Sequence, residues 1–78
     1  MEYKLTRHAR ERMAKRGIQE EDLDAALENI QSATDTPQDS TCIVGITQFG
    51  ELKIWIVGGW PQDGVLVVKS TAWKGDGE

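Results

Sequence analysis

The stretch Leu52-Lys53-Ile54-Trp55-Ile56-Val57-Gly58 is the middle one of three apolar runs that decide the fold. It is preceded by Cys42–Thr47 and followed by Val65–Trp73, and all three runs are rich in residues that favour β-strands. The connections between them, Gln48–Glu51 and Gly59–Gly64, are short and contain glycine. Strands joined by such short loops pair antiparallel, so the sequence predicts an antiparallel meander.

Two helices are predicted before these strands. Thr6 is a suitable N-cap for a helix over residues 7–16, and Gly17 suits the position just beyond its end. A second helix is predicted over residues 20–31. Acidic residues crowd its first turn, where they complement the helix dipole, and apolar residues recur at helical spacing after them.

The predicted domain therefore has three parts. Residues 1–31 form a helical half, residues 32–40 a polar linker, and residues 41–73 the antiparallel strands. Residues 2–5 are a candidate for a short additional strand. We predict a single α+β domain, in which two N-terminal helices pack on one face of a three- or four-stranded antiparallel meander sheet. With 78 residues, the chain has little room for a second domain.

The charge of the chain is unevenly distributed. The net charge of −4 argues, at face value, against a nucleic-acid-binding protein. However, residues 1–16 contain six basic and two acidic residues, whereas residues 17–78 contain three basic and eleven acidic residues. The two parts thus carry net charges of +4 and −8. The cations gather on the first predicted helix, which permits a local phosphate site and argues against broad binding along a nucleic acid.

Composition also excludes several classes of protein. No stretch approaches the roughly 20 apolar residues that span a bilayer, and the N-terminal charges are not followed by the apolar run of a secretory signal peptide. The single cysteine, Cys42, cannot form an internal disulfide, and with one histidine it cannot complete a zinc site of the Cys/His type. The hairpin glycines are no phosphate cradle. We therefore expect a cytoplasmic protein with no metal, no small-molecule cofactor and no membrane contact.

His8, Arg12 and Arg16 form the candidate functional site. Spaced four residues apart, they make a row on the first helix that runs along the edge of its buried stripe. Arginines offer planar, bidentate donors to phosphate, and histidine is the side chain that titrates near neutral pH. This set is sufficient for metal-free cleavage of RNA, in which the ribose 2′-hydroxyl attacks the adjacent phosphorus. DNA lacks that hydroxyl, so the reaction selects RNA.

A structural role is the alternative for this row. The arginines can pair with acids of the second helix, such as Asp24 or Glu28, and His8 can cap or pack without chemistry. The protein would then be a non-catalytic interaction module that binds a partner protein or a second copy of itself. Trp60, in the second hairpin loop, is the tryptophan expected to be exposed for such a contact.

The last predicted strand turns polar from Lys69 onward. Strict alternation puts Lys69 and Thr71 on one face together with Val65, Val67 and Trp73. This end of the strand can meet the first helix and deliver both polar side chains toward the arginines. Alternatively, it is a strand end that frays into solvent, which is the interpretation favoured for Ser70 and Lys74.

The segment Thr6–Ile18 resembles the opening signature of a family of small bacterial proteins catalogued as domain of unknown function 4258. That signature contains Thr-x-His-Ala, Arg-Met and Arg-Gly-Ile in this order and is followed by an acidic second helix, which begins here at Glu20. The family is similar in its helix-then-meander plan to the RelE/ParE-like toxins and to the wider group of metal-independent ribonucleases. The resemblance implies RNA and an antitoxin-like protein as partners. It implies these catalytic residues: His8, Arg12 and Arg16, completed by Lys69 or Thr71.

Overall fold

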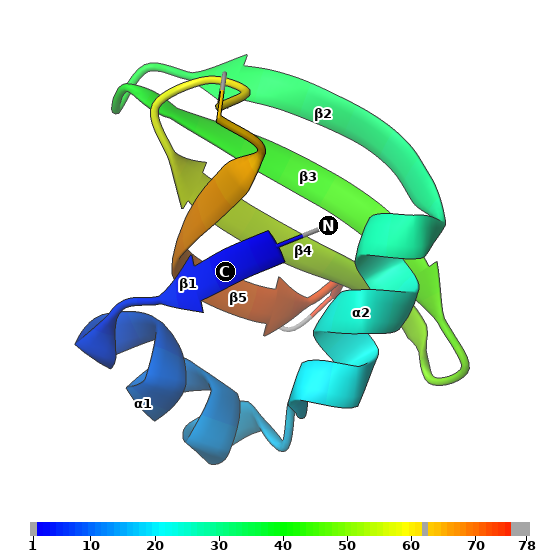
Figure 1. Ribbon diagram of the computed structural model, residues 1–78. Coiled ribbons are helices and arrows are strands. Elements are labelled where there is room, and N and C mark those ends of the chain that lie inside the picture. The colour runs from blue at the N-terminus through cyan, green and yellow to red at the C-terminus, as the bar shows by residue number, and fades with distance from the viewer. Residues whose placement is uncertain (1, 62, 76–78) are drawn as a thin grey trace.

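The computed structural model describes residues 2–61 and 63–75, and within them it contains one sheet and two helices (Figure 1). The sheet has five strands in the order β1-β5-β4-β3-β2. β1 pairs in parallel with β5, and the other neighbours pair antiparallel. Along the chain the elements are β1 (Glu2–Leu5), α1 (Arg7–Arg16), α2 (Glu20–Glu28), β2 (Ile30–Thr36), β3 (Ser40–Thr47), β4 (Gly50–Val57) and β5 (Val65–Trp73).

The predicted arrangement of two N-terminal helices on a three- or four-stranded antiparallel meander is wrong. The sheet is mixed, and both helices lie between its first and second strands in the chain. Residues 2–5 do form a strand, but this strand lies at the sheet edge beside β5, more than 60 residues away. The pairing continues to the start of α1, because the backbone N–H of Thr6 donates to the carbonyl of Val68 at 3.1 Å.

The segment predicted as a helix end and a polar linker instead forms β2 and the turn after it. α2 ends at Glu28 rather than at Gln31, and Asn29 closes the helix with its N–H on the carbonyl of Ala26. β2 is an edge strand, and most of its side chains are exposed. Polar residues are therefore tolerated on both faces of β2. Its sequence consequently lacks the alternation of apolar and polar residues that identifies a half-buried strand.

Both helices contribute to one hydrophobic core on the same face of the sheet. α1 lies against β5, and α2 lies against β3 and β4. The two helices and the facing strands share one cluster of buried side chains. Its fully covered members include Ala9, Leu23, Ile43, Leu52, Ile54 and Val68.

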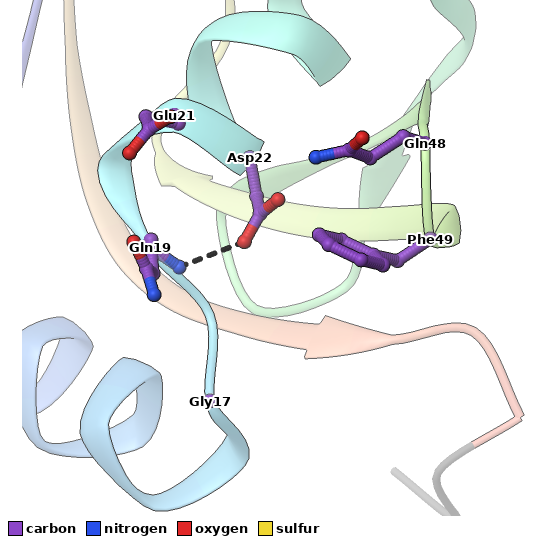
Figure 2. A pocket seen from close by; sticks show the side chains of 6 residues that line it. All are labelled: Gly17, Gln19, Glu21, Asp22, Gln48 and Phe49. Carbon is purple, nitrogen blue, oxygen red and sulfur yellow. Dashed lines mark hydrogen bonds between the residues drawn. The ribbon is translucent and has the colours of Figure 1, made fainter.

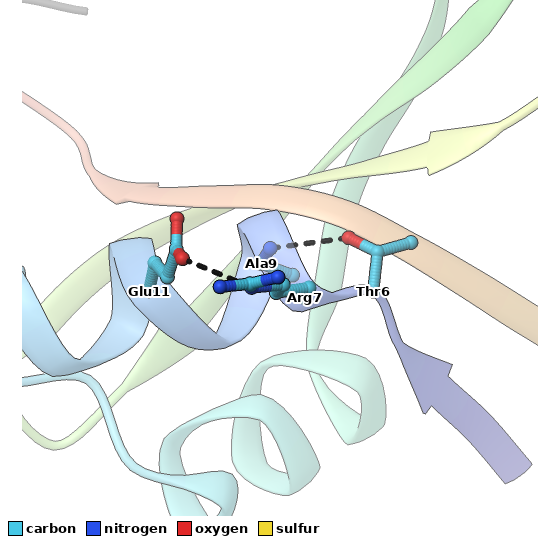
Figure 3. A network of polar contacts seen from close by, with 4 residues as sticks. All are labelled: Thr6, Arg7, Ala9 and Glu11. Atoms are coloured by element: carbon cyan, nitrogen blue, oxygen red, sulfur yellow. Dashed lines mark hydrogen bonds and ion pairs between the residues drawn. The ribbon is translucent and has the colours of Figure 1, made fainter.

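The predicted first helix is confirmed with both of its ends. The hydroxyl of Thr6 accepts a hydrogen bond from the backbone N–H of Ala9 at 3.1 Å, as an N-cap does (Figure 3). Gly17 ends the helix with φ of 67°, in the left-handed region that favours glycine. Ala9 and Met13 bury the inner face of α1, and this packing fixes which residues of the helix face solvent. No helix among the described residues is long and apolar enough to cross a membrane.

Candidate functional site

His8 and Arg12 form a direct side-chain pair on the surface of α1. Nε of Arg12 donates a hydrogen bond to Nε2 of His8 at 3.2 Å. His8 is exposed and Arg12 is half-buried. Because Nε2 accepts this bond, it carries a lone pair, and the ring proton of the neutral imidazole is on Nδ1. The predicted row thus brings an imidazole and a guanidinium into contact at the surface.

Arg16, the third member of the row, connects the last turn of α1 to β5. Its Nη1 donates to the backbone carbonyl of Thr71 at 2.6 Å. In return, the indole Nε1 of Trp73 donates to the backbone carbonyl of Arg16 at 3.0 Å. These two bonds hold the end of the helix against the end of the strand, so Arg16 has a structural role at this position.

A β-bulge at Lys69 changes which side chains of β5 face the helices. Val68 lies opposite Ile56, whereas Ser70 lies opposite Trp55, so Lys69 is an extra residue between two consecutive partners. After the bulge, Thr71 lies opposite Ile54 on the helix-covered face. Val67 and Thr71 therefore do not share a face, and the strict alternation predicted for this strand is wrong.

The bulge puts Thr71 in the core and leaves Lys69 half-buried. Thr71 is fully covered, and its hydroxyl has no hydrogen-bond partner within the described part of the chain. The Thr71 hydroxyl is therefore not presented to solvent beside the exposed His8. The contact that brings Thr71 to the row is made by its backbone carbonyl, through Arg16.

We expect Thr71→Val to leave the protein as stable or to stabilise it by up to about 1 kcal/mol, because it removes a buried hydroxyl that has no partner. The buried Thr41 is the matched control, since its hydroxyl lies 3.1 Å from Oδ1 of Asp35 and 2.9 Å from the carbonyl of Gly58. Thr41→Val should cost about 1 kcal/mol or more. Urea unfolding measures both changes. A loss at Thr71 as large as that at Thr41 would mean that the Thr71 hydroxyl does have a partner.

The acidic start of α2 contacts β1. The hydroxyl of Tyr3 donates to Oε1 of Glu20 at 3.3 Å. The pKa of Tyr3 lies well above its ordinary value because the phenol is removed from water and because Asp24 and Glu20 lie nearby. Tyr3 thus remains neutral and donates to these carboxylates. On α1, Arg7 pairs with Glu11 at 3.4 Å, and both side chains are largely exposed (Figure 3).

The described residues include neither an activated thiol nor a cluster of metal ligands. Burial raises the pKa of the Cys42 thiol, and this outweighs the opposite effect of nearby Lys53, so the thiol is not activated. Within the described residues, no three His, Cys, Asp or Glu side chains gather in a way that could hold a metal ion.

Sequence reasoning missed a cavity formed by the start of α2 and the β3–β4 loop (Figure 2). Neither His8 nor Arg12 nor Arg16 lines it. The only local signals were an acidic residue at the third position of a helix and a Gln-Phe-Gly hairpin loop. Each of these has an ordinary structural explanation, and only the tertiary fold brings them together.

Comparison with known proteins finds one family. A family model described as "Domain of unknown function (DUF4258)" matches residues 5–71, which include α1, α2, β2, β3, β4 and most of β5. No curated protein and no solved structure matches the chain.

Proposed function

The chain belongs to this DUF4258 family, and we propose that it binds RNA at α1 and cleaves it without a metal ion. His8 acts as the general base, and Arg12 binds the phosphate group that is cleaved. The net charge of +4 on residues 1–16 supports a polyanion such as RNA as the substrate.

The hydrogen bond between Arg12 and His8 is the observation that carries this proposal. In the free protein, the guanidinium occupies the lone pair of Nε2. When a phosphate oxygen draws Arg12 into a charge-assisted, bidentate contact, Nε2 is released as a proton acceptor beside the bound phosphate. Substrate binding and activation of the base are thereby coupled.

The reaction follows from these two groups. Nε2 of His8 takes the proton of the ribose 2′-hydroxyl, and the 2′-oxygen forms a bond to the adjacent phosphorus. The bond between phosphorus and the 5′-oxygen of the next nucleotide breaks, and this oxygen takes a proton from water. The proton held by His8 then neutralises the hydroxide left behind, which restores the base. The products are a 2′,3′-cyclic phosphate and a 5′-hydroxyl. Arg12 stabilises the charge that develops on the phosphate oxygens.

Two of the other predicted site residues support this pair. Arg16 is a positioning residue, because its bond to the carbonyl of Thr71 fixes the C-terminal end of α1. Lys69, the half-buried bulge residue on the same strand, follows the core residue Val68 and therefore has no assigned step in the reaction. Thr71 contributes through its backbone. The exposed Arg10 and Lys15 strengthen the local positive potential.

The substrate requirement gives the test of this function. The protein is incubated in EDTA with a labelled RNA and with the same sequence carrying 2′-O-methyl groups. We expect the RNA alone to be cleaved, with 2′,3′-cyclic phosphate ends detected by mass spectrometry. Cleavage of the 2′-O-methyl strand, or no cleavage of RNA at all, would refute the proposal.

A non-catalytic interaction module is the second candidate function, favoured by exposed apolar side chains. Ile46, Val57, Val67 and Trp60 are each between 38% and 53% exposed. The first three lie on the face of the sheet opposite the helices, because each alternates along its strand with residues of the buried core. This candidate predicts self-association, or binding of an antitoxin-like protein, that Val57→Lys abolishes. Sedimentation of the wild type and the variant distinguishes it from the first candidate.

A further inference from the structure

The cavity at the start of α2 has the lining of a site for a cation. It has a volume of about 200 Å³ and opens between the α1–α2 connection and the β3–β4 loop (Figure 2). Two of its residues carry carboxylates, two carry amides, one is aromatic, and none is basic. The lining consists of Gly17, Gln19, Glu21, Asp22, Gln48 and Phe49.

Asp22 directs one oxygen of its carboxylate into this cavity. The residue is only 5% exposed. Its Oδ2 accepts a hydrogen bond from the backbone N–H of Gln19 at 2.9 Å. No described residue donates to its Oδ1, which points toward Gln48 and Phe49 (Figure 2). Since this carboxylate oxygen is open to the cavity, it can accept a charge-assisted hydrogen bond from a cationic donor.

Phe49 presents its ring at the mouth of the same cavity. It is 69% exposed, more than any other large apolar side chain in residues 2–61 and 63–75. The ring lies nearly perpendicular to that of Trp73, with centroids 6.2 Å apart and planes at 82°. One ring face therefore remains available for a planar cation to stack on. Trp73 is itself held by the bond from its indole N–H to the carbonyl of Arg16, so the Phe49 ring that packs on it is positioned before any ligand binds.

We propose that this cavity binds the guanidinium group of an arginine side chain from a partner polypeptide. The guanidinium donates to Oδ1 of Asp22 and stacks on Phe49, and the amide of Gln48 lines the same space. Glu21 adds negative charge at the rim. An arginine fits better than a lysine, because a planar group can stack on the ring while it donates sideways to several acceptors. This site is separate from His8 and Arg12 and does not depend on the proposed RNA cleavage.

The test uses three short peptides that differ at one position. Acetyl-Gly-Arg-Gly-amide is titrated into the labelled protein and followed by NMR, beside the same peptide with citrulline or lysine. Citrulline has nearly the same shape but no charge. We expect the arginine peptide to shift the amide signals of Gln19, Asp22 and Phe49 and to bind at least about tenfold more tightly than citrulline, a factor that corresponds to about 1.4 kcal/mol.

Matched variants place the binding at this cavity. Glu21→Gln should weaken binding of the arginine peptide, whereas Glu28→Gln, which removes the same charge from an exposed position of α2 outside the cavity, should not. Phe49→Leu should weaken it as well and leave the fold intact. Equal binding of arginine and citrulline, equal binding of arginine and lysine, or signal changes confined to other surfaces would overturn the proposal.

Discussion

Replacement of Gly45 by alanine is expected to destabilise the protein by about 3 kcal/mol or more, which is the upper range for overpacking of a core. Gly45 lies in the middle of β3, where α2 crosses the sheet. A Cβ atom at this position would lie 2.6 Å from the carbonyl carbon of Ala26 and would also meet its oxygen. These are backbone atoms of a helix, so no rotamer change can relieve the contact. The helix must move away from the sheet, which opens the core around Leu23 and Ile43.

Gly59 provides the matched control for this substitution. It lies in the β4–β5 loop, a Cβ atom there would meet nothing within 4 Å, and its φ is outside the positive region. Gly59→Ala should therefore change stability by less than about 0.5 kcal/mol. Urea unfolding of both variants gives the comparison. Equal stability of the two variants would contradict the close contact between α2 and β3.

Replacement of His8 by alanine is expected to lower the rate of RNA cleavage by about 100-fold or more, the usual contribution of a general base. His8 is exposed and its only side-chain bond among described residues is with Arg12, so the fold should be unaffected. The control is Arg10→Ala, which shortens an exposed side chain two residues further along the same helix. Arg10→Ala should weaken RNA binding slightly, mainly at low salt, and leave the cleavage step unchanged. Single-turnover rates at saturating protein separate these two effects. Equal rates for the two variants would show that His8 is not the base.

Local signals predicted α1 well. Thr6 and Gly17 cap the two ends of the helix through contacts within a few residues. The sequence alone therefore identifies where the helix begins and ends. The length of α2 was overestimated because Ile30 continues the helical spacing of apolar residues. In the structure, Ile30 packs against the core from the first position of β2 instead.

The sheet could not be predicted completely, because its edges depend on non-local pairing. β1 is four residues long and finds its partner in β5. β2 has exposed side chains on both faces, so its polar sequence resembles that of a linker. The bulge at Lys69 has no local signal of its own, yet it reverses the orientation of every later side chain of β5.

The candidate site was partly predictable for the same reason. Residues four positions apart on a helix are neighbours, so the contact between His8 and Arg12 follows from their spacing. The role of Arg16 depends on its bond to Thr71 of β5, which is 55 residues further along the chain. The sequence predicted only that Arg16 is a cation at the border of the core. The cavity at Asp22 needs α2 and the β3–β4 loop together, and neither segment indicates it alone.

A double-mutant cycle between His8 and Arg12 tests the central claim, that these two side chains act as one unit. Cleavage of the same RNA in EDTA is measured for the wild type, His8→Ala, Arg12→Ala and the double variant. If Arg12 binds the phosphate whose cleavage His8 promotes, the double variant should be about as slow as His8→Ala alone. Independent effects that multiply in the double variant, or a wild type that is no faster than any variant, would contradict the account.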